Sequence, residues 1–300
     1  MELSQTSQSL LYQGVRKTKS EKEAPRTSTA TIIRKILDDV EKINKRASTE
    51  AQLWKSIRNR AIRKPITDFL WLSIHGAHKT GSFWEKIPNM QERAEYPKCK
   101  VTEDMEHILT ACKATGQELI WKCAKELWTK KGGKWPKMSF GAILGNGLIP
   151  FPFPQKKKGD TTTSNGTTKR KRPKAKAAGY TNGDKRLFTI IVTESAYLIW
   201  KLRNERRIKH NDNPDWEHAE EDVKNKWFQS LDVRLRKDQY MTKERNLKKD
   251  AIEERIVENT WSKILQNEES LPEDWIRKNR VLVGRGRPPD PQGSGSRGTS

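Results

Sequence analysis

The stretch from Pro150 to Asp184 divides the chain into two parts that must fold on either side of it. It reads PFPFPQKKKGDTTTSNGTTKRKRPKAKAAGYTNGD, and its Pro, Gly, Thr and Lys content cannot supply a hydrophobic core. We therefore expect residues 150–185 to form a disordered basic linker. Because only 33% of the whole chain is hydrophobic, we expect compact helical islands joined by loose segments.

Eleven tryptophans argue against a wholly disordered chain, because each indole offers a large apolar area for burial. Apolar residues recur at helical spacing after residue 31. Thr49 and Gln52 have the spacing of a capping box at a helix start, and Pro65 should begin a further helix. Another apolar face runs from about Gln117 to Thr129. The fold class is therefore predicted to be mainly α.

Two further helix starts are predicted from capping residues. Thr102 stands before two acids as the N-cap of a helix that carries His107. Ser270 with Glu273 suggests a last capped helix bearing Trp275. The predicted organisation is a disordered leader (1–30), a helical module (31–149), the basic linker (150–185), a second helical region (186–283) and a disordered tail (284–300).

The charge of the chain favours a polyanionic partner. Sixty Lys and Arg residues against 38 Asp and Glu give a formal net charge of +22, a field that attracts polyanions and raises their encounter rate. Nucleic acid, RNA or DNA, is the first candidate. A basic membrane-surface protein is less well supported, because such proteins carry a long helix with a clean apolar face and few acids mixed in.

Neither a membrane span nor a secretory signal is expected. The most apolar stretch, Leu187 to Leu202, is interrupted by Glu194 and Lys201 and falls short of the roughly 18 apolar residues that a span requires. The first residues, MELSQTSQSLLYQG, lack the features of a signal peptide. Three cysteines suit a disulfide framework poorly. We therefore expect a reducing, intracellular compartment.

Several segments together resemble one known family. They are Trp54, FLWLSIHGAHKTGSFWEKIP (69–88), YPKCKVTEDMEHILTAC (96–112) and GQELIWKCAKELW (116–128). This run resembles the reverse-transcriptase zinc-binding (zf-RVT-like) module of fungal non-LTR retrotransposon polyproteins, the part that follows the ribonuclease H domain. The segments QSLLYQGVR (8–16), TESAYLIWKLRNERRI (193–208) and VLVGRGRPP (281–289) are similar to the flanking regions of that module.

The resemblance implies a small zinc-knuckle-like module with four metal ligands, which fall here on Tyr96, Cys99, His107 and Cys112. The first position is not a cysteine, so the motif is degenerate. Zinc prefers four tetrahedral donors drawn from thiolate and imidazole, and a phenol with a pKa near 10 is a poor donor at neutral pH. Three ligands can still hold zinc weakly, with an open fourth position.

Other metal-site interpretations are less favoured. An open coordination position is also typical of zinc hydrolases, but no residue nearby is spaced as a general base. Cys123 could serve as a substitute ligand, yet its place on the apolar face of a helix favours a small buried hydrophobe. His75 and His78 lie one helical turn apart, without a third residue spaced to complete a site.

Three groups of cations are candidates for nucleic-acid contacts. The linker run could bind phosphates or a nuclear import receptor, and the tail pair has the core sequence of an AT-hook. The third group ends the long apolar helix, where an exposed face could contact phosphates or simply complement the helix dipole. The candidates are Lys169, Arg170, Lys171, Arg172 and Lys174 in the linker, Arg203, Arg206 and Arg207 at the helix end, and Arg285 and Arg287 in the tail.

No catalytic residues are expected. Asp38 and Asp39 lie in a helical pattern on a solvated face, whereas polymerase aspartates need a hairpin that aims them at two metal ions. The leading hypothesis is a non-catalytic, nuclear or otherwise cytoplasmic, nucleic-acid-associated fragment of a retrotransposon protein. Under this hypothesis the chain binds RNA or DNA mainly through backbone electrostatics. Neither a membrane nor a small-molecule substrate is expected as a partner. The alternatives are a protein-interaction or structural module, and a decayed retroelement fragment without selected function.

Overall fold

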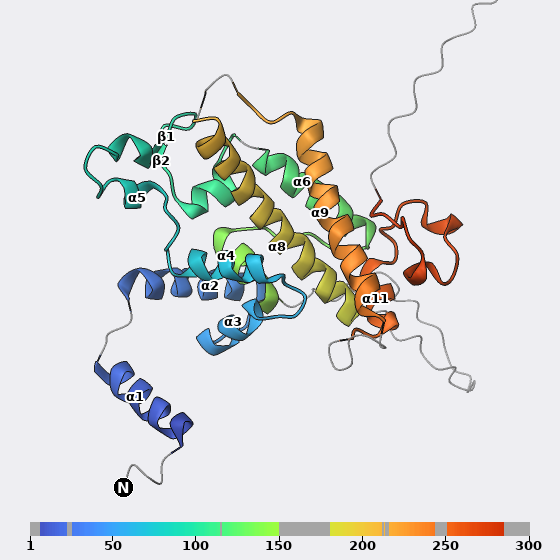
Figure 1. Cartoon of the computed structure of the whole chain (residues 1–300), viewed down its shortest axis with the longest axis horizontal. Coiled ribbons are helices and arrows are strands. Elements are labelled where there is room, and N and C mark those ends of the chain that lie inside the picture. The colour runs from blue at the N-terminus through green and yellow to red at the C-terminus, as the bar shows by residue number, and fades with distance from the viewer. Residues whose placement is uncertain are drawn as a thin grey trace, which may run out of the picture.

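The computed structural model is mainly α-helical, which confirms the predicted fold class (Figure 1). It describes residues 7–22, 26–114, 116–149, 181–211, 213, 216–243 and 251–284. The longer helices are α1 (Gln8–Lys22), α2 (Thr27–Asn44), α3 (Glu50–Ile57), α4 (Lys64–Ile74), α6 (Gln117–Lys130), α8 (Asn182–Asn204), α9 (Glu220–Met241) and α11 (Glu254–Trp261).

Short elements connect these helices. They are α5 (Gly81–Trp84) and α7 (Phe140–Leu144), the 3-10 turns η2 (Gln91–Ala94), η4 (Asn146–Leu148), η7 (Glu268–Ser270) and η8 (Trp275–Arg277), the π-helical turns η3 (His107–Ala111) and η5 (Glu205–Lys209), and the strands β1 (Glu95–Tyr96) and β2 (Val101–Thr102). The two strands pair antiparallel, with Glu95 opposite Thr102. Among the described helices, none has both the length and the apolar character that a membrane span requires.

Helix α8 runs through the middle of the molecule, between α4, α6, α9 and α11 (Figure 1). Its first turn is held by a capping box of Thr181 and Asp184, so the helix begins inside the segment expected to be linker. Apolar side chains then cover most of its circumference from Leu187 to Leu202, and they are buried. As a result, one hydrophobic core extends from Ile33 to Val283. The two predicted helical regions therefore share a core instead of forming separate islands.

Several local predictions match the structure. Thr49 and Gln52 form the expected capping box of α3, and Pro65 lies in the first turn of α4. Helix α6 extends one residue beyond its predicted end, and Cys123 is buried on its apolar face. These features depend on residues close together in the sequence, so they could be predicted from local patterns.

Three expectations about the chain were wrong in detail. Thr102 lies in β2, and Asp104 instead caps the turn that carries His107, accepting a hydrogen bond from the His107 backbone N–H at 2.6 Å. Trp275 begins a short 3-10 turn rather than a helix capped by Ser270. The leader contains α1, which lies apart from the other helices (Figure 1).

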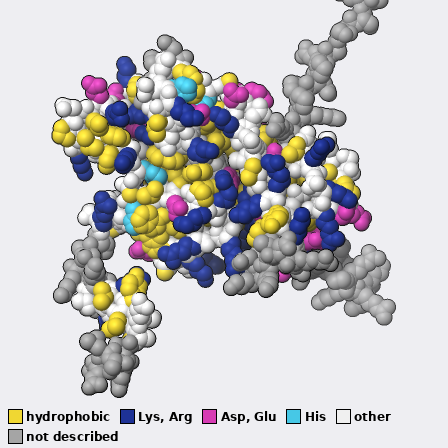
Figure 2. Space-filling model, in the orientation of Figure 1, with side chains coloured by type: hydrophobic (Ala, Val, Ile, Leu, Met, Phe, Trp, Pro, Cys, Tyr) yellow, Lys and Arg dark blue, Asp and Glu magenta, His cyan; other side chains and the backbone are white. Residues whose placement is uncertain are grey.

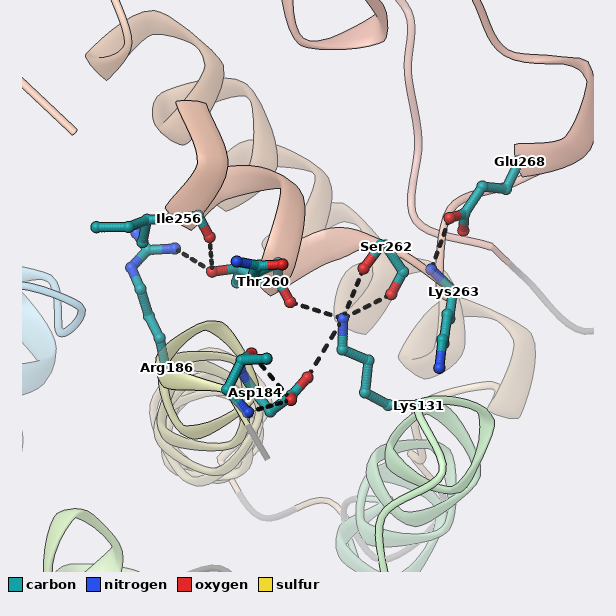
Figure 3. Close-up of polar contacts among 10 residues, drawn as sticks. Lys131, Asp184, Arg186, Ile256, Thr260, Ser262, Lys263 and Glu268 are labelled. Atoms are coloured by element: carbon teal, nitrogen blue, oxygen red, sulfur yellow. Dashed lines mark hydrogen bonds and ion pairs between the residues drawn. The ribbon is translucent and has the colours of Figure 1, made fainter. Parts of the chain in front are cut away.

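A buried lysine joins three helices near the start of α8 (Figure 3). The Lys131 ammonium donates to the backbone oxygens of Asn259 and Ser262, both at 2.7 Å, and lies 3.5 Å from the Asp184 carboxylate. Burial lowers the pKa of Lys131, and Asp184 counteracts this shift. Because carbonyls at a helix end have no partner within the helix, Lys131 completes the end of α11 while it ties α6 to α8.

A second buried network links α8, α9 and α11. Asp238 has no exposed surface and accepts two hydrogen bonds from Arg186, at 2.6 and 2.7 Å, and one from the Trp261 indole at 2.8 Å. The guanidinium of Arg234, also buried, lies 3.3 Å from the same carboxylate. Burial lowers the pKa of Arg234, and Asp238 opposes that shift. One carboxylate thus compensates two arginines inside the core.

Candidate metal centre

A tight turn between β1 and β2 places Cys99 beside Tyr96. The backbone oxygen of Tyr96 accepts hydrogen bonds from the N–H groups of Cys99, at 3.2 Å, and Lys100, at 2.8 Å. Lys100 adopts a φ of 51°, in the left-handed region, which lets the chain reverse before Val101 pairs with Tyr96. The first half of the predicted motif is therefore a short hairpin that presents one cysteine.

The other two predicted ligands flank the π-helical turn η3. His107 opens the turn and Cys112 follows it, and the Cys112 backbone N–H donates to the His107 oxygen at 2.8 Å. The sulfur atoms of Cys99 and Cys112 and a ring nitrogen of His107 all lie within 4.8 Å of one another. The three residues predicted from the sequence are thus brought together in a group that could hold a metal ion.

The chemistry of this group fits a metal ion. The Nε2 atom of His107 is buried and has no hydrogen-bond partner among the described residues, a costly condition for a polar atom. Burial, together with the neighbouring Cys99 thiol, raises the pKa of Cys112 to about 11. A divalent cation would supply a partner for His107 and favour the thiolate form of Cys112.

Position 96 also belongs to the cluster. The Tyr96 side chain is 1% exposed and packs with Cys112, Ala114 and Cys99. Two guanidinium groups lie near its ring, with the Cζ atoms of Arg206 and Arg207 at 5.5 and 5.8 Å from the ring centroid. At the position where the sequence resemblance would place a fourth thiolate, this chain has a buried aromatic ring beside two cations.

Arg203 at the end of α8, with Arg206 and Arg207 of η5, lies against the β1–β2 hairpin. Arg203 is buried and forms a two-pronged ion pair with the buried Glu103, next to β2. Arg206 is 2% exposed, while Arg207 donates to the backbone oxygens of Arg93, at 2.6 Å, and Glu95, at 3.3 Å. The exposed face expected for these residues is not present, because their side chains face the hairpin.

The remaining predicted cations lie outside the described residues. These are Lys169, Arg170, Lys171, Arg172, Lys174, Arg285 and Arg287. Their proposed contacts with nucleic acid stay predictions from the sequence.

Asp39, His75 and His78, considered from the sequence as possible metal ligands, all have contacts within the fold. Asp39 is largely covered and not solvated, because it accepts hydrogen bonds from the Ser139 hydroxyl at 2.7 Å and from a backbone N–H at the start of α7 at 3.2 Å. His75 stacks on Trp54, with ring centroids 5.3 Å apart. His78 lies within 3.1 Å of the Phe69 backbone oxygen. Neither histidine belongs to a metal-binding group among the described residues.

A basic groove between α3 and α4 was missed in the sequence. Exposed Arg58, Arg60 and Lys64 line a hollow of about 600 Å³ together with Trp71, which is 47% exposed. We call this hollow the α3–α4 groove. Figure 2 shows Lys and Arg side chains bordering hydrophobic ones over these helices. The sequence feature that indicates this groove is the basic run IRNRAIRK (57–64), between two predicted helices.

Comparison of the chain with protein-family models, with curated proteins and with solved structures finds no match.

The raised pKa of Cys112 predicts that metal binding depends on pH. At neutral pH a thiol with a pKa of about 11 is protonated, so a bound metal must displace its proton. We expect the apparent zinc affinity to fall about tenfold for each unit of decreasing pH and each displaced proton. Titration against a competing chelator, from mildly alkaline to mildly acidic buffer, measures this slope. A flat profile would contradict ligation by Cys112.

Proposed function

We propose that this chain is a non-catalytic, zinc-stabilised region of a retrotransposon protein that binds RNA or DNA through backbone phosphates. The observation that carries the proposal is the α3–α4 groove, where three exposed cations meet an exposed tryptophan. Arginine and lysine side chains that neutralise phosphates provide most of sequence-independent affinity. The net charge of +22 adds a long-range attraction for the same ligand.

Within this proposal, zinc acts as a structural ion. Two cysteines and one histidine are donors that zinc prefers, and their ligand atoms already lie within 4.8 Å of one another. The resemblance of residues 54–128 to the reverse-transcriptase zinc-binding module supports the same metal. Bound there, zinc would fix the hairpin against η3. The hairpin is in turn tied to η5 by Arg207.

The proposal predicts binding that weakens steeply with salt. If about six to ten phosphates are contacted, affinity should fall about 10³- to 10⁵-fold between about 50 and 200 mM salt. Replacing Arg58, Arg60 and Lys64 together by Gln should reduce the slope of log affinity against log salt by about one for each lost contact. Fluorescence anisotropy of a labelled oligonucleotide measures both quantities.

A matched variant separates the groove from net charge. Lys237, Arg255 and Arg280 are also exposed and do not line the α3–α4 groove. They also do not line a second hollow, of about 920 Å³, that shares Asp68 with the groove. Their replacement by Gln removes the same charge but no contact in the groove. It should therefore leave most of the salt dependence of binding intact. Equal losses in the two triple variants would show that the groove has no special part in binding. No binding of RNA or DNA even in dilute buffer would reject the proposed function.

A further inference from the structure

A second hollow, of about 920 Å³, adjoins the α3–α4 groove, and Asp68 lines both. It lies between α4, the α5–η2 segment and the C-terminal end of α8. Figure 2 shows hydrophobic side chains gathered on this face. Aromatic rings from α4, α5, α8 and the loop between α4 and α5 line it, namely Phe69, His78, Trp84, Tyr197 and Trp200. We call this hollow the aromatic cleft.

Trp84 is the ring in the cleft that is best placed to receive a ligand. Its indole N–H donates to the Lys79 backbone oxygen at 3.1 Å, which holds the ring in orientation. One face is covered by the Arg93 guanidinium, 5.4 Å from the ring. Arg93 is an exposed side chain, so it can move aside or stack over a planar ligand. The Phe83 ring meets Trp84 edge-on, with ring centroids 5.1 Å apart. Trp200 is flanked instead by His78 and by Arg203, whose guanidinium is buried in its ion pair with Glu103 and is not free to move aside.

Cations also line the cleft. Lys79 and Arg93 are exposed there, and Arg207 lies deeper. Of the acids that line the cleft, Asp68 is paired with Lys64, which leaves Glu92 and Glu95. Beyond this Lys64–Asp68 pair, the exposed Arg58 and Arg60 of the α3–α4 groove add positive charge. The combination of flat rings with flanking cations matches a ligand that alternates planar bases with phosphates.

We propose that the aromatic cleft takes an unpaired base of a single-stranded nucleic acid, which stacks on Trp84 while the strand continues along the α3–α4 groove. This inference rests on the proposed function and names its substrate class. A base inside a duplex has both faces stacked on its neighbours and cannot enter such a cleft without being extruded. Single strands expose these faces, and stacking on aromatic side chains is tolerant of sequence.

The test compares a labelled single strand with a duplex of the same length and sequence, by anisotropy with the full chain at low salt. We expect the single strand to bind more tightly. Trp84→Leu should weaken single-strand binding about 5- to 150-fold and leave duplex binding within about twofold. Trp84→Phe keeps an aromatic face and should restore most of the affinity.

Two controls address folding and specificity. Trp84 is not part of the buried core, so thermal unfolding of Trp84→Leu should resemble that of the wild type. Tyr240, which is 52% exposed on α9 with Lys243 over its ring, is a matched aromatic outside the cleft. Tyr240→Leu should leave single-strand binding unchanged. Arg93→Gln, an exposed substitution, should weaken single-strand binding and so gives a second reading if Trp84→Leu is unstable.

The outcomes separate this inference from the proposed function. Equal binding of single strand and duplex, with Trp84→Leu and Arg93→Gln like wild type, overturns the inference while the phosphate-binding function stands. Failure of the wild-type chain to bind either oligonucleotide overturns both. Equal losses for Trp84→Leu and Trp84→Phe also contradict stacking, because the phenyl ring keeps a face for the base.

Discussion

Asp238→Asn is expected to lower the free energy of unfolding by about 3–5 kcal/mol, the usual cost of removing one partner from a buried ion pair. Asp238 is fully buried and compensates both Arg186 and Arg234. The amide that replaces it keeps the shape of the side chain but has no charge. Two guanidinium groups would then share a buried site with no carboxylate between them, and the Trp261 indole would lose a charged acceptor.

Chemical denaturation followed by circular dichroism measures this loss. Asp274→Asn is the matched control. Asp274, like Asp238, pairs with a cation four residues away, here Lys278 at 2.9 Å, but its side chain is 53% exposed. An exposed pair contributes up to about 1 kcal/mol. If the two variants lose the same stability, the buried network has no special importance for the fold.

Tyr96→Cys is expected to increase zinc affinity by more than about 100-fold, because changes even to residues behind the metal ligands alter affinity about 10- to 100-fold. Position 96 packs against Cys99 and Cys112, so a thiolate there would join the three existing donors to complete a tetrahedral set. Removal of the Tyr96 ring also leaves a cavity, which destabilises the metal-free chain. The variant should therefore depend on zinc more strongly for its stability.

Metal analysis of the purified protein and competition with a chelator measure the change. Tyr96→Phe, which keeps the ring and removes only the hydroxyl, should bind zinc as the wild type does. Cys112→Ser should weaken zinc binding in either background, because it leaves two donors in the wild type and three in Tyr96→Cys. Equal zinc affinities of wild type and Tyr96→Cys would reject the view that Tyr96 weakens the site.

The sequence could predict which three residues form the candidate metal centre, but not which residues surround them. A sequence resemblance pointed to Cys99, His107 and Cys112, and the structure brings their ligand atoms together. The sequence did not reveal that Arg206 and Arg207 lie beside the Tyr96 ring. These arginines are more than a hundred positions further along the chain, so no local pattern connects them with the hairpin.

The sequence by itself determined the helical class, the start of α3 at its capping box and the buried place of Cys123 on α6. Such features follow from hydrogen bonds and apolar spacing within a few residues. Local periodicity shows that a helix has an apolar face, but it does not show which element covers that face.

Only the tertiary structure showed the roles of the charged residues. It also showed that the two predicted helical regions share one core. Helix α8 is apolar around most of its surface, so its burial requires helices from both sides of the linker. Arg203 then meets Glu103 a hundred positions away, and Arg63 meets Glu194 across 131. A charged residue is buried only where a distant partner compensates it. For this reason Arg203 lies inside the molecule, while Arg58 and Arg60 remain exposed on the surface.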